Sequence, residues 1–216
     1  MNKIKILLED DNEVLGNGLG HPALRQYLPT LKYIDLLNKF NIRGTFFIDM
    51  SHYIFLKDNI KTKDFEFQVK CIEETIIHLI KNKMDVQLHL HSQWVDAEIR
   101  NNNTYVTKIW NIGELREDKQ RKLFKNALEA TTNLTKDFNN HKINAFKAGS
   151  WGLQPFKNLY DIFIKNNIKL VFGPIKGLLV KDLNIDYRKL HSDFFPYYAS
   201  KENINKVSNK KKIVIF

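Results

Sequence analysis

The chain has 216 residues, 43% of them hydrophobic, which is enough for the core of one domain and excludes intrinsic disorder. Its formal net charge is +10, but the lysines are scattered and form no basic helix, so the composition favours a charged surface over nucleic-acid binding. No apolar run approaches the roughly 20 residues that span a bilayer, and no signal peptide is visible. We therefore expect a single cytoplasmic domain over residues 1–216, with peripheral contact to a membrane left open.

Hydrophobic patterns along the chain predict strands that alternate with helices. The expected strands cover residues 3–9, 43–49, 85–91, 144–149, 169–172 and 212–216, with a further one at 185–191. The expected helices cover about 29–40, 66–82, 114–138 and 156–166. This alternation is typical of an α/β fold with a mostly parallel sheet, either open or closed.

Most polar candidate residues lie at or just beyond the carboxyl ends of these strands. Asp10 and Asp11 end the first strand, His89 and His91 end the third, and residues 147–151 end the fourth. Functional sites of parallel α/β folds are built at this edge. The agreement between three separate strands is stronger evidence for a site than any one of these residues.

The two histidines alternate with leucines, so Gln87, His89 and His91 share one face of their strand. Imidazoles at i and i+2 lie about 6–7 Å apart along the strand and can converge on one cation. An isolated His-x-His pair is more often a hydrogen-bonded pair in a polar interior. Carboxylates expected nearby shift the balance toward a metal site.

Adjacent acidic residues at a strand end are usually a solvated turn, so Asp10 and Asp11 alone would indicate little. If both enter one site, their repulsion requires a cation, which a metal would supply. Strict alternation places the two side chains on opposite faces. The strand must therefore end or bend here for both to reach the site.

Four stretches, in order and with matching spacing over roughly residues 3–175, resemble the polysaccharide deacetylases (the NodB-homology superfamily, carbohydrate esterase family four). Residues 8–11 resemble the family's Thr-Phe-Asp-Asp motif, and residues 45–47 its Thr-Phe-Phe strand. Residues 85–89 resemble the strand that ends in a metal-binding histidine, and residues 146–152 stand at its Arg-Ala-Gly stretch. Together they look most like the WbmS-like branch, which is associated with bacterial surface-polysaccharide gene clusters.

The resemblance implies a distorted (β/α) barrel of about seven parallel strands, a divalent ion that is often zinc, and an acetylated sugar or glycan precursor as substrate. Hydrolysis of an N- or O-acetyl group in O-antigen or capsule assembly is the implied reaction. By position, Asp10 matches the catalytic base, Asp11 and His89 match metal ligands, and Lys147 matches an arginine that steadies the base. A lysine lacks the bidentate fork of that arginine.

Substrate contacts are expected next to these motifs. Trp94 and Trp151 could stack on sugar rings, although ordinary packing explains each of them equally well. Gly149 and Ser150 belong to the same expected substrate-binding stretch as Trp151.

Three departures from the family pattern bear on the site. Gln93 stands where a second metal-binding histidine is usual, so His91 is expected to replace it. Asn12 replaces a glycine. The family's last motif supplies an acid histidine after a late strand, whereas here residues 212–216 form that strand and end the sequence; His191 is the candidate replacement. The alternatives are an incomplete C-terminal end and an inactive metal- or glycan-binding protein of the same fold.

Overall fold

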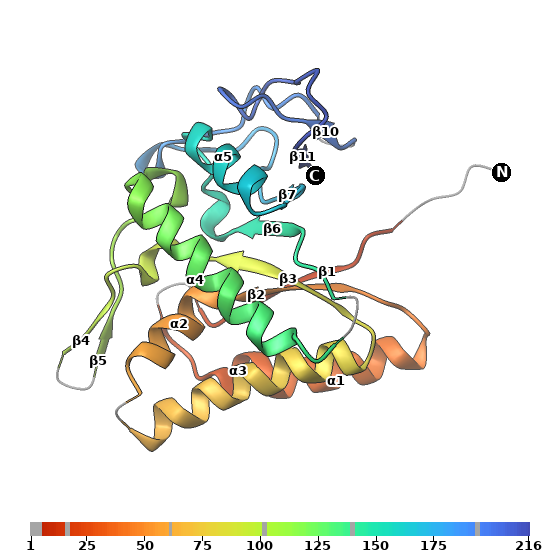
Figure 1. The fold of residues 1–216 in the computed structure, drawn as a ribbon, viewed down its shortest axis with the longest axis vertical. Helices are drawn as coiled ribbons and strands as arrows, with labels where there is room; N and C mark the ends of the chain where they lie inside the picture. The colour runs from red at the N-terminus through yellow and green to blue at the C-terminus, as the bar shows by residue number, and fades with distance from the viewer. Residues whose placement is uncertain (1–5, 16–17, 61, 101–102, 139–140, 193–194) are drawn as a thin grey trace.

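The computed structural model describes residues 6–15, 18–60, 62–100, 103–138, 141–192 and 195–216. Its main feature is a seven-stranded sheet with the strand order β1-β2-β3-β6-β7-β11-β10 (Figure 1). The first six strands of this order pair in parallel, and β10 runs antiparallel to β11. These strands are β1 (Glu9–Asn12), β2 (Thr45–Asp49), β3 (Asp85–Leu90), β6 (Ala145–Ala148), β7 (Leu170–Phe172), β10 (Tyr197–Tyr198) and β11 (Val214–Ile215).

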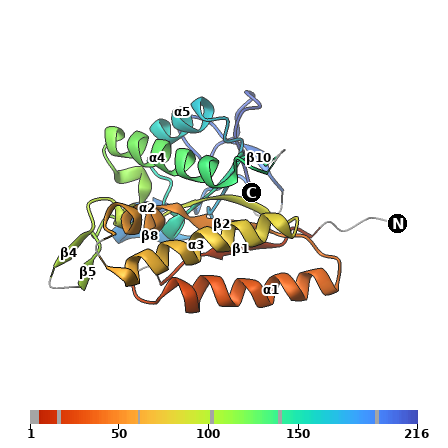
Figure 2. The same ribbon diagram turned by 60° about the horizontal axis from the view of Figure 1, so that its bottom comes forward.

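Five α-helices pack as one layer against this sheet. They are α1 (Leu28–Lys39), α2 (Met50–Asp58), α3 (Lys63–Lys81), α4 (Glu117–Thr135) and α5 (Lys157–Lys165). Contacts run from α1 to α3, from α3 to α2 and α4, and from α4 to α5, and Figure 2 shows α1 and α5 at opposite ends of this layer. The predicted α/β class and a mostly parallel sheet of seven strands are confirmed, although β10 is antiparallel and the sheet of the described residues does not close into a barrel. None of the described helices combines the length and apolarity needed to cross a membrane.

Two small hairpins lie outside the main sheet. One joins β4 (Glu98–Arg100) to β5 (Asn103–Tyr105), and the other joins β8 (Leu179–Val180) to β9 (Ile185–Asp186). The strand expected over residues 185–191 is therefore only the two-residue β9. The strand expected over 212–216 is β11, which lies between β7 and β10.

The first strand differs most from its expected position. The expected span is 3–9, of which residues 3–5 lie outside the described part of the chain, whereas β1 covers Glu9–Asn12. It pairs along its whole length with Thr45–Ile48 of β2. This pairing carries the strand past Asp10 and Asp11, which consequently lie inside it and not at its end.

Helix α2 was not predicted from the sequence. Asp49 caps its amino end, since the carboxylate accepts hydrogen bonds from the backbone N–H groups of Ser51 and His52 at 3.0 and 3.3 Å. The helix is buried on most of its circumference, including Met50, Ser51, His52, Tyr53, Phe55 and Leu56. A helix buried on most sides shows no amphipathic stripe, which is the signal on which sequence-based prediction depends.

The two faces of the sheet have different contents. Alternate residues such as Phe46, Ile48, Leu88 and Phe146 face the helices and belong to one large apolar cluster. On the other face, called the inner face below, the described apolar cluster consists only of Phe47, Ala145 and Phe172, with Leu170 against it. The inner face therefore has room for polar side chains at the carboxyl ends of the strands.

Candidate metal centre

Strand β1 sorts its acidic residues between the two faces. Asn12 points toward the helices, where its Nδ2 donates to Thr30 Oγ1 of α1 at 2.7 Å. Asp10, on the same side as Asn12, accepts a 3.4 Å hydrogen bond from Asn12 Nδ2. Glu9 and Asp11 occupy the alternate positions and both reach Lys147 of β6. Alternation therefore separates Asp10 from Asp11, because β1 continues through both residues and does not end between them, as their joint entry into one site had required.

Three potential metal ligands converge at the carboxyl ends of β1 and β3. Oε2 of Glu13 and Nε2 of His89 and of His91 lie within 4.8 Å of one another. The two Nε2 atoms are 3.0 Å apart, and Glu13 Oε2 is 3.4 Å from His89 Nε2 and in still closer contact with His91 Nε2. Both histidines are almost fully buried, at 2% and 5% exposure. The cluster is thus largely shielded from water.

The hydrogen bonds of His89 fix which of its nitrogens faces the cluster. Its Nδ1 lies 2.9 Å from the backbone oxygen of Lys147, which can only accept, so Nδ1 carries the proton in neutral imidazole. Nε2 then presents a lone pair toward His91 and Glu13. A backbone carbonyl that orients the far nitrogen of a metal-binding histidine is a common arrangement at metal sites.

The cluster requires a positive charge at its centre. Oε2 of Glu13 is buried, and among the described residues it faces Nε2 of His89 at 3.4 Å and Nε2 of His91 at a still shorter distance. Burial alone would lower the pKa of His91, but the hydrogen bond to Glu13 and the charges of Asp49 and Glu13 outweigh it and raise this pKa to about 9. Burial opposes ionisation of Glu13, yet hydrogen bonds to the two histidines hold the pKa of its carboxyl well below its usual value. A proton or a metal ion can supply this charge, and two imidazoles with one carboxylate form a donor set that zinc accepts.

Two neighbours hold His91 in place. Gln93, which stands at the family's second histidine position, contacts the His91 ring through Nε2, 2.9 Å from His91 Nδ1, and does not join the cluster. A Cβ on Gly149 would lie 2.6 Å from Cγ and Nδ1 of the His91 ring. Only glycine permits this approach of β6 to the histidine. Gly149 is therefore part of the site's support, where the sequence had indicated substrate contact.

Beside the cluster lies a second charged group on the inner face. Lys147 Nζ is 2.9 Å from Glu9 Oε1 and 2.9 Å from Asp11 Oδ1. Burial would lower the pKa of Lys147, but the two carboxylates outweigh it and raise this pKa. Lys147 thus steadies Asp11 and Glu9 directly, where Asp10 was the expected partner. Burial also raises the pKa of Asp10, with Lys147 opposing it as a nearby charge.

The remaining sequence candidates lie in different surroundings. Trp94 is only 5% exposed and packs against His52 and Phe55, so its environment is that of a core residue. Trp151 is 43% exposed, and both Ser150 and Trp151 adopt positive φ angles, a costly conformation for such side chains. His191 precedes β10, which is the edge of the sheet opposite β1, and its ring contacts Tyr197 edge-on.

Glu13 is the site residue that the sequence reasoning missed. It follows Asp11 by two residues, so the same alternation that links His89 to His91 places it on the inner face. The signal was present but depended on knowing that β1 runs through Asn12. With the strand placed at residues 3–9, Glu13 fell in the following loop.

Comparison with known proteins supports the fold. No family model and no curated protein matches the sequence. Among solved structures, a protein from Mycobacterium smegmatis, provisionally named a polysaccharide deacetylase, has a TM-score of 0.51 at 10% identity. The match covers 97% of this chain and 56% of that one, so the present chain spans little more than half of its length.

A CE4 family pseudoenzyme from Bacillus anthracis also matches, as the wild type with a TM-score of 0.42 at 15% identity and as a mutant with 0.43 at 16%. These matches cover 76% of this chain and 41% and 42% of the others. The first match extends the resemblance noted in the sequence to the overall fold. The chain has an α/β fold similar to that of the Mycobacterium smegmatis protein.

Proposed function

We propose that this chain is a metal-dependent hydrolase that removes an N- or O-acetyl group from a sugar or polysaccharide precursor. The observation that carries the proposal is the convergence of Glu13, His89 and His91 within 4.8 Å, next to the Asp11–Lys147 pair. A metal-binding cluster beside a carboxylate that can accept a proton is the pairing that hydrolysis of an acetyl group needs.

In this proposal Glu13, His89 and His91 hold the ion, and zinc fits their donor set. A bound divalent ion supplies Lewis acidity toward an acetyl carbonyl. The sequence resemblance pointed to Asp11 as a ligand and Asp10 as the base, whereas the geometry favours Glu13 as the ligand and Asp11 as the base. Asp10 is on the helix-facing side of β1, bonded to Asn12.

The protein's own residues then have separate tasks. Asp11, partly exposed and held by Lys147 at 2.9 Å, accepts a proton from the attacking water. The ion pair with Lys147 also fixes the position of the Asp11 carboxylate. Ser150 and the exposed Trp151 ring offer contacts for the sugar, because both follow β6 directly at the edge where the cluster lies. His191 stays a proposed proton donor to the leaving group, on the resemblance alone.

The setting of the reaction is proposed from the resemblance to the WbmS-like branch. That branch places the activity in surface-polysaccharide assembly, such as O-antigen or capsule, and the composition favours the cytoplasm. Peripheral association with a membrane is compatible with the net charge of +10, since anionic lipids and anionic precursors would both attract the surface.

The test is acetate release from a panel of N- and O-acetylated sugars, with zinc, nickel or cobalt added. We expect release with at least one substrate, abolished by a chelator and restored by the metal. Absence of release from every substrate, by protein shown to contain the metal, would contradict the proposal.

The second candidate is an inactive metal- or glycan-binding protein of the same fold. It is favoured by one observation, namely that Glu13, His89 and His91 account for metal binding by themselves, without any catalytic step. This candidate predicts metal binding and sugar binding without acetate release.

A further inference from the structure

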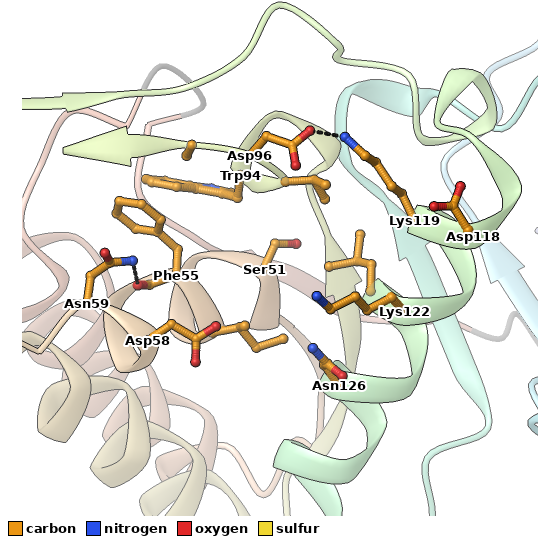
Figure 3. A pocket seen from close by; sticks show the side chains of 14 residues that line it. Ser51, Phe55, Asp58, Asn59, Trp94, Asp96, Asp118, Lys119, Lys122 and Asn126 are labelled. Atoms are coloured by element: carbon orange, nitrogen blue, oxygen red, sulfur yellow. Dashed lines mark hydrogen bonds and ion pairs between the residues drawn. The ribbon is translucent and has the colours of Figure 1, made fainter. Parts of the chain in front are cut away.

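A cavity of about 360 Å³ lies between α2 and α4, on the helix side of the sheet and therefore apart from the inner-face cluster. Figure 3 shows its lining residues. They come from α2 (Ser51, Phe55, Asp58), from the segment after β3 (Trp94, Asp96) and from the first half of α4 (Lys119, Lys122, Asn126). The volume is within the usual range of small-molecule sites.

The floor of this cavity is buried and the rim is charged. Ser51, Trp94 and Phe55 are 2%, 5% and 6% exposed. Ser51 Oγ accepts a 2.7 Å hydrogen bond from the backbone N–H of His91, which leaves its own hydroxyl proton to be donated. Figure 3 shows this hydroxyl directed into the cavity. A ligand that reached the floor would meet one hydroxyl donor on an otherwise apolar surface.

The charges at the rim divide into paired and unpaired groups. Lys119 contacts Asp96, and Asp118 is 3.0 Å from Arg116, so these four are neutralised locally. For Asp58, Lys122 and Asn126, no side-chain hydrogen bond or ion pair is found within the described ranges. Figure 3 shows these three side chains around the same opening.

The unpaired rim groups and the apolar floor together indicate which class of ligand the cavity can bind. One carboxylate and one ammonium give the unpaired groups no net charge, so a multiply charged anion such as a phosphate gains little here. Asp58 accepts hydrogen bonds, Lys122 donates them, and Asn126 does both. Opposed donors and acceptors over an apolar floor suit a neutral molecule with several hydroxyl groups.

We propose that the cavity between α2 and α4 binds a neutral, hydroxyl-rich ligand of the size of a sugar residue. Asp58 and Asn126 bind its hydroxyl groups at the rim, and Trp94 and Phe55 contact its apolar side. The site is separate from the proposed hydrolase centre, and the inference holds whether or not the chain releases acetate.

The test is calorimetric titration of the full chain with neutral hexoses and N-acetylhexosamines, with inorganic phosphate and a zwitterionic amino acid as competing chemistries. We expect saturable binding of at least one neutral sugar. Asp58→Asn and Asn126→Ala should each weaken it about tenfold, the usual cost of losing a hydrogen bond to a charged or buried group. Asp35→Asn, an exposed aspartate on α1, is the matched control and should leave binding unchanged.

The thermal midpoints of the cavity variants and sugar binding by Glu13→Ala distinguish loss of the site from loss of the fold. Asp58 and Lys122 are exposed, so Asp58→Asn and Lys122→Met should fold, as an unchanged thermal midpoint would verify. Binding that persists after Glu13→Ala would place the sugar away from the metal cluster. No binding of any neutral sugar, binding only of phosphate or of the amino acid, or binding that the cavity variants leave unchanged would overturn the proposal.

Discussion

The two faces of the central sheet use the same strands for different purposes. Phe46, Leu88 and Phe146 point toward the helices and lie in the large core cluster, whereas their neighbours Phe47, His89 and Lys147 point to the inner face. At each of these positions, adjacent residues point to opposite faces, so one packs in the core and the next lies on the face that holds the metal cluster. A substitution on one face should therefore change folding, and a substitution on the other should change metal binding or activity.

The largest expected effect on the inner face concerns the proposed base. Asp11→Asn should lower acetate release by roughly 10²–10⁴-fold, the usual contribution of general base catalysis, without loss of metal. Asp10→Asn, on the helix-facing side of the same strand, is the matched control and should have a much smaller effect. Rates measured at saturating zinc would test this. A larger loss in Asp10→Asn, or metal loss in Asp11→Asn, would reverse the assignment.

On the helix-facing side, the sharpest change is Phe146→Ala. Phe146 is fully buried and its ring contacts Phe124 and Phe163 at 5.1 and 5.2 Å between centroids. Truncation leaves a cavity and should reduce the free energy of unfolding by about 3–5 kcal/mol. Denaturant titration measures this loss. The variant should keep its metal while folded. Loss of metal from the folded variant would contradict the claim that helix-facing residues affect folding and not metal binding.

A pH effect should arise from the helix layer. Burial lowers the pKa of His52 to about 4, against 6.5 when exposed, and Asp49 only partly opposes this. As pH falls from 6.5 to 4, His52 therefore becomes protonated in the unfolded chain but stays neutral in the folded chain. Over this window the free energy of unfolding should decrease by up to ~3 kcal/mol.

The control for this pH effect is the variant His52→Phe, which keeps a ring against Trp94. In the native protein the centroids of the His52 and Trp94 rings are 4.3 Å apart. The difference between wild type and variant isolates the contribution of His52 from that of other titrating groups. Parallel stability curves for the two proteins between pH 4 and 6.5 would show that His52 does not resist protonation.

A smaller effect is expected where the two faces meet. Gly149→Ala places a methyl group 2.6 Å from the His91 ring, so either the ring or the backbone must shift. Displacing a ligand's support typically weakens metal affinity by about 10–100-fold. Competition with a chromogenic chelator measures this. Gly44→Ala is the control for the general cost of replacing a glycine, since a Cβ there would make only ordinary contacts at 3.5–3.6 Å. Unchanged affinity in Gly149→Ala would contradict the role given to that residue.

The sequence predicted much of this arrangement because alternation is a local property. His89 and His91 share the inner face as expected, and β2, β3, β6 and β7 lie within two residues of their expected bounds. The extension of β1 depends on pairing with β2, and the two-residue strand β10 depends on pairing with β11. Neither leaves a local pattern, so Glu13 was assigned to a loop and Asp11 to the ligand position.

The most direct test of the account is the metal content of the purified protein, measured by mass spectrometry after dialysis against zinc. We predict about one ion per chain in the wild type and in Asp11→Asn, and almost none in Glu13→Ala or His89→Ala. An empty wild-type protein, or full occupancy in Glu13→Ala, would contradict the metal centre on which the proposed hydrolase depends.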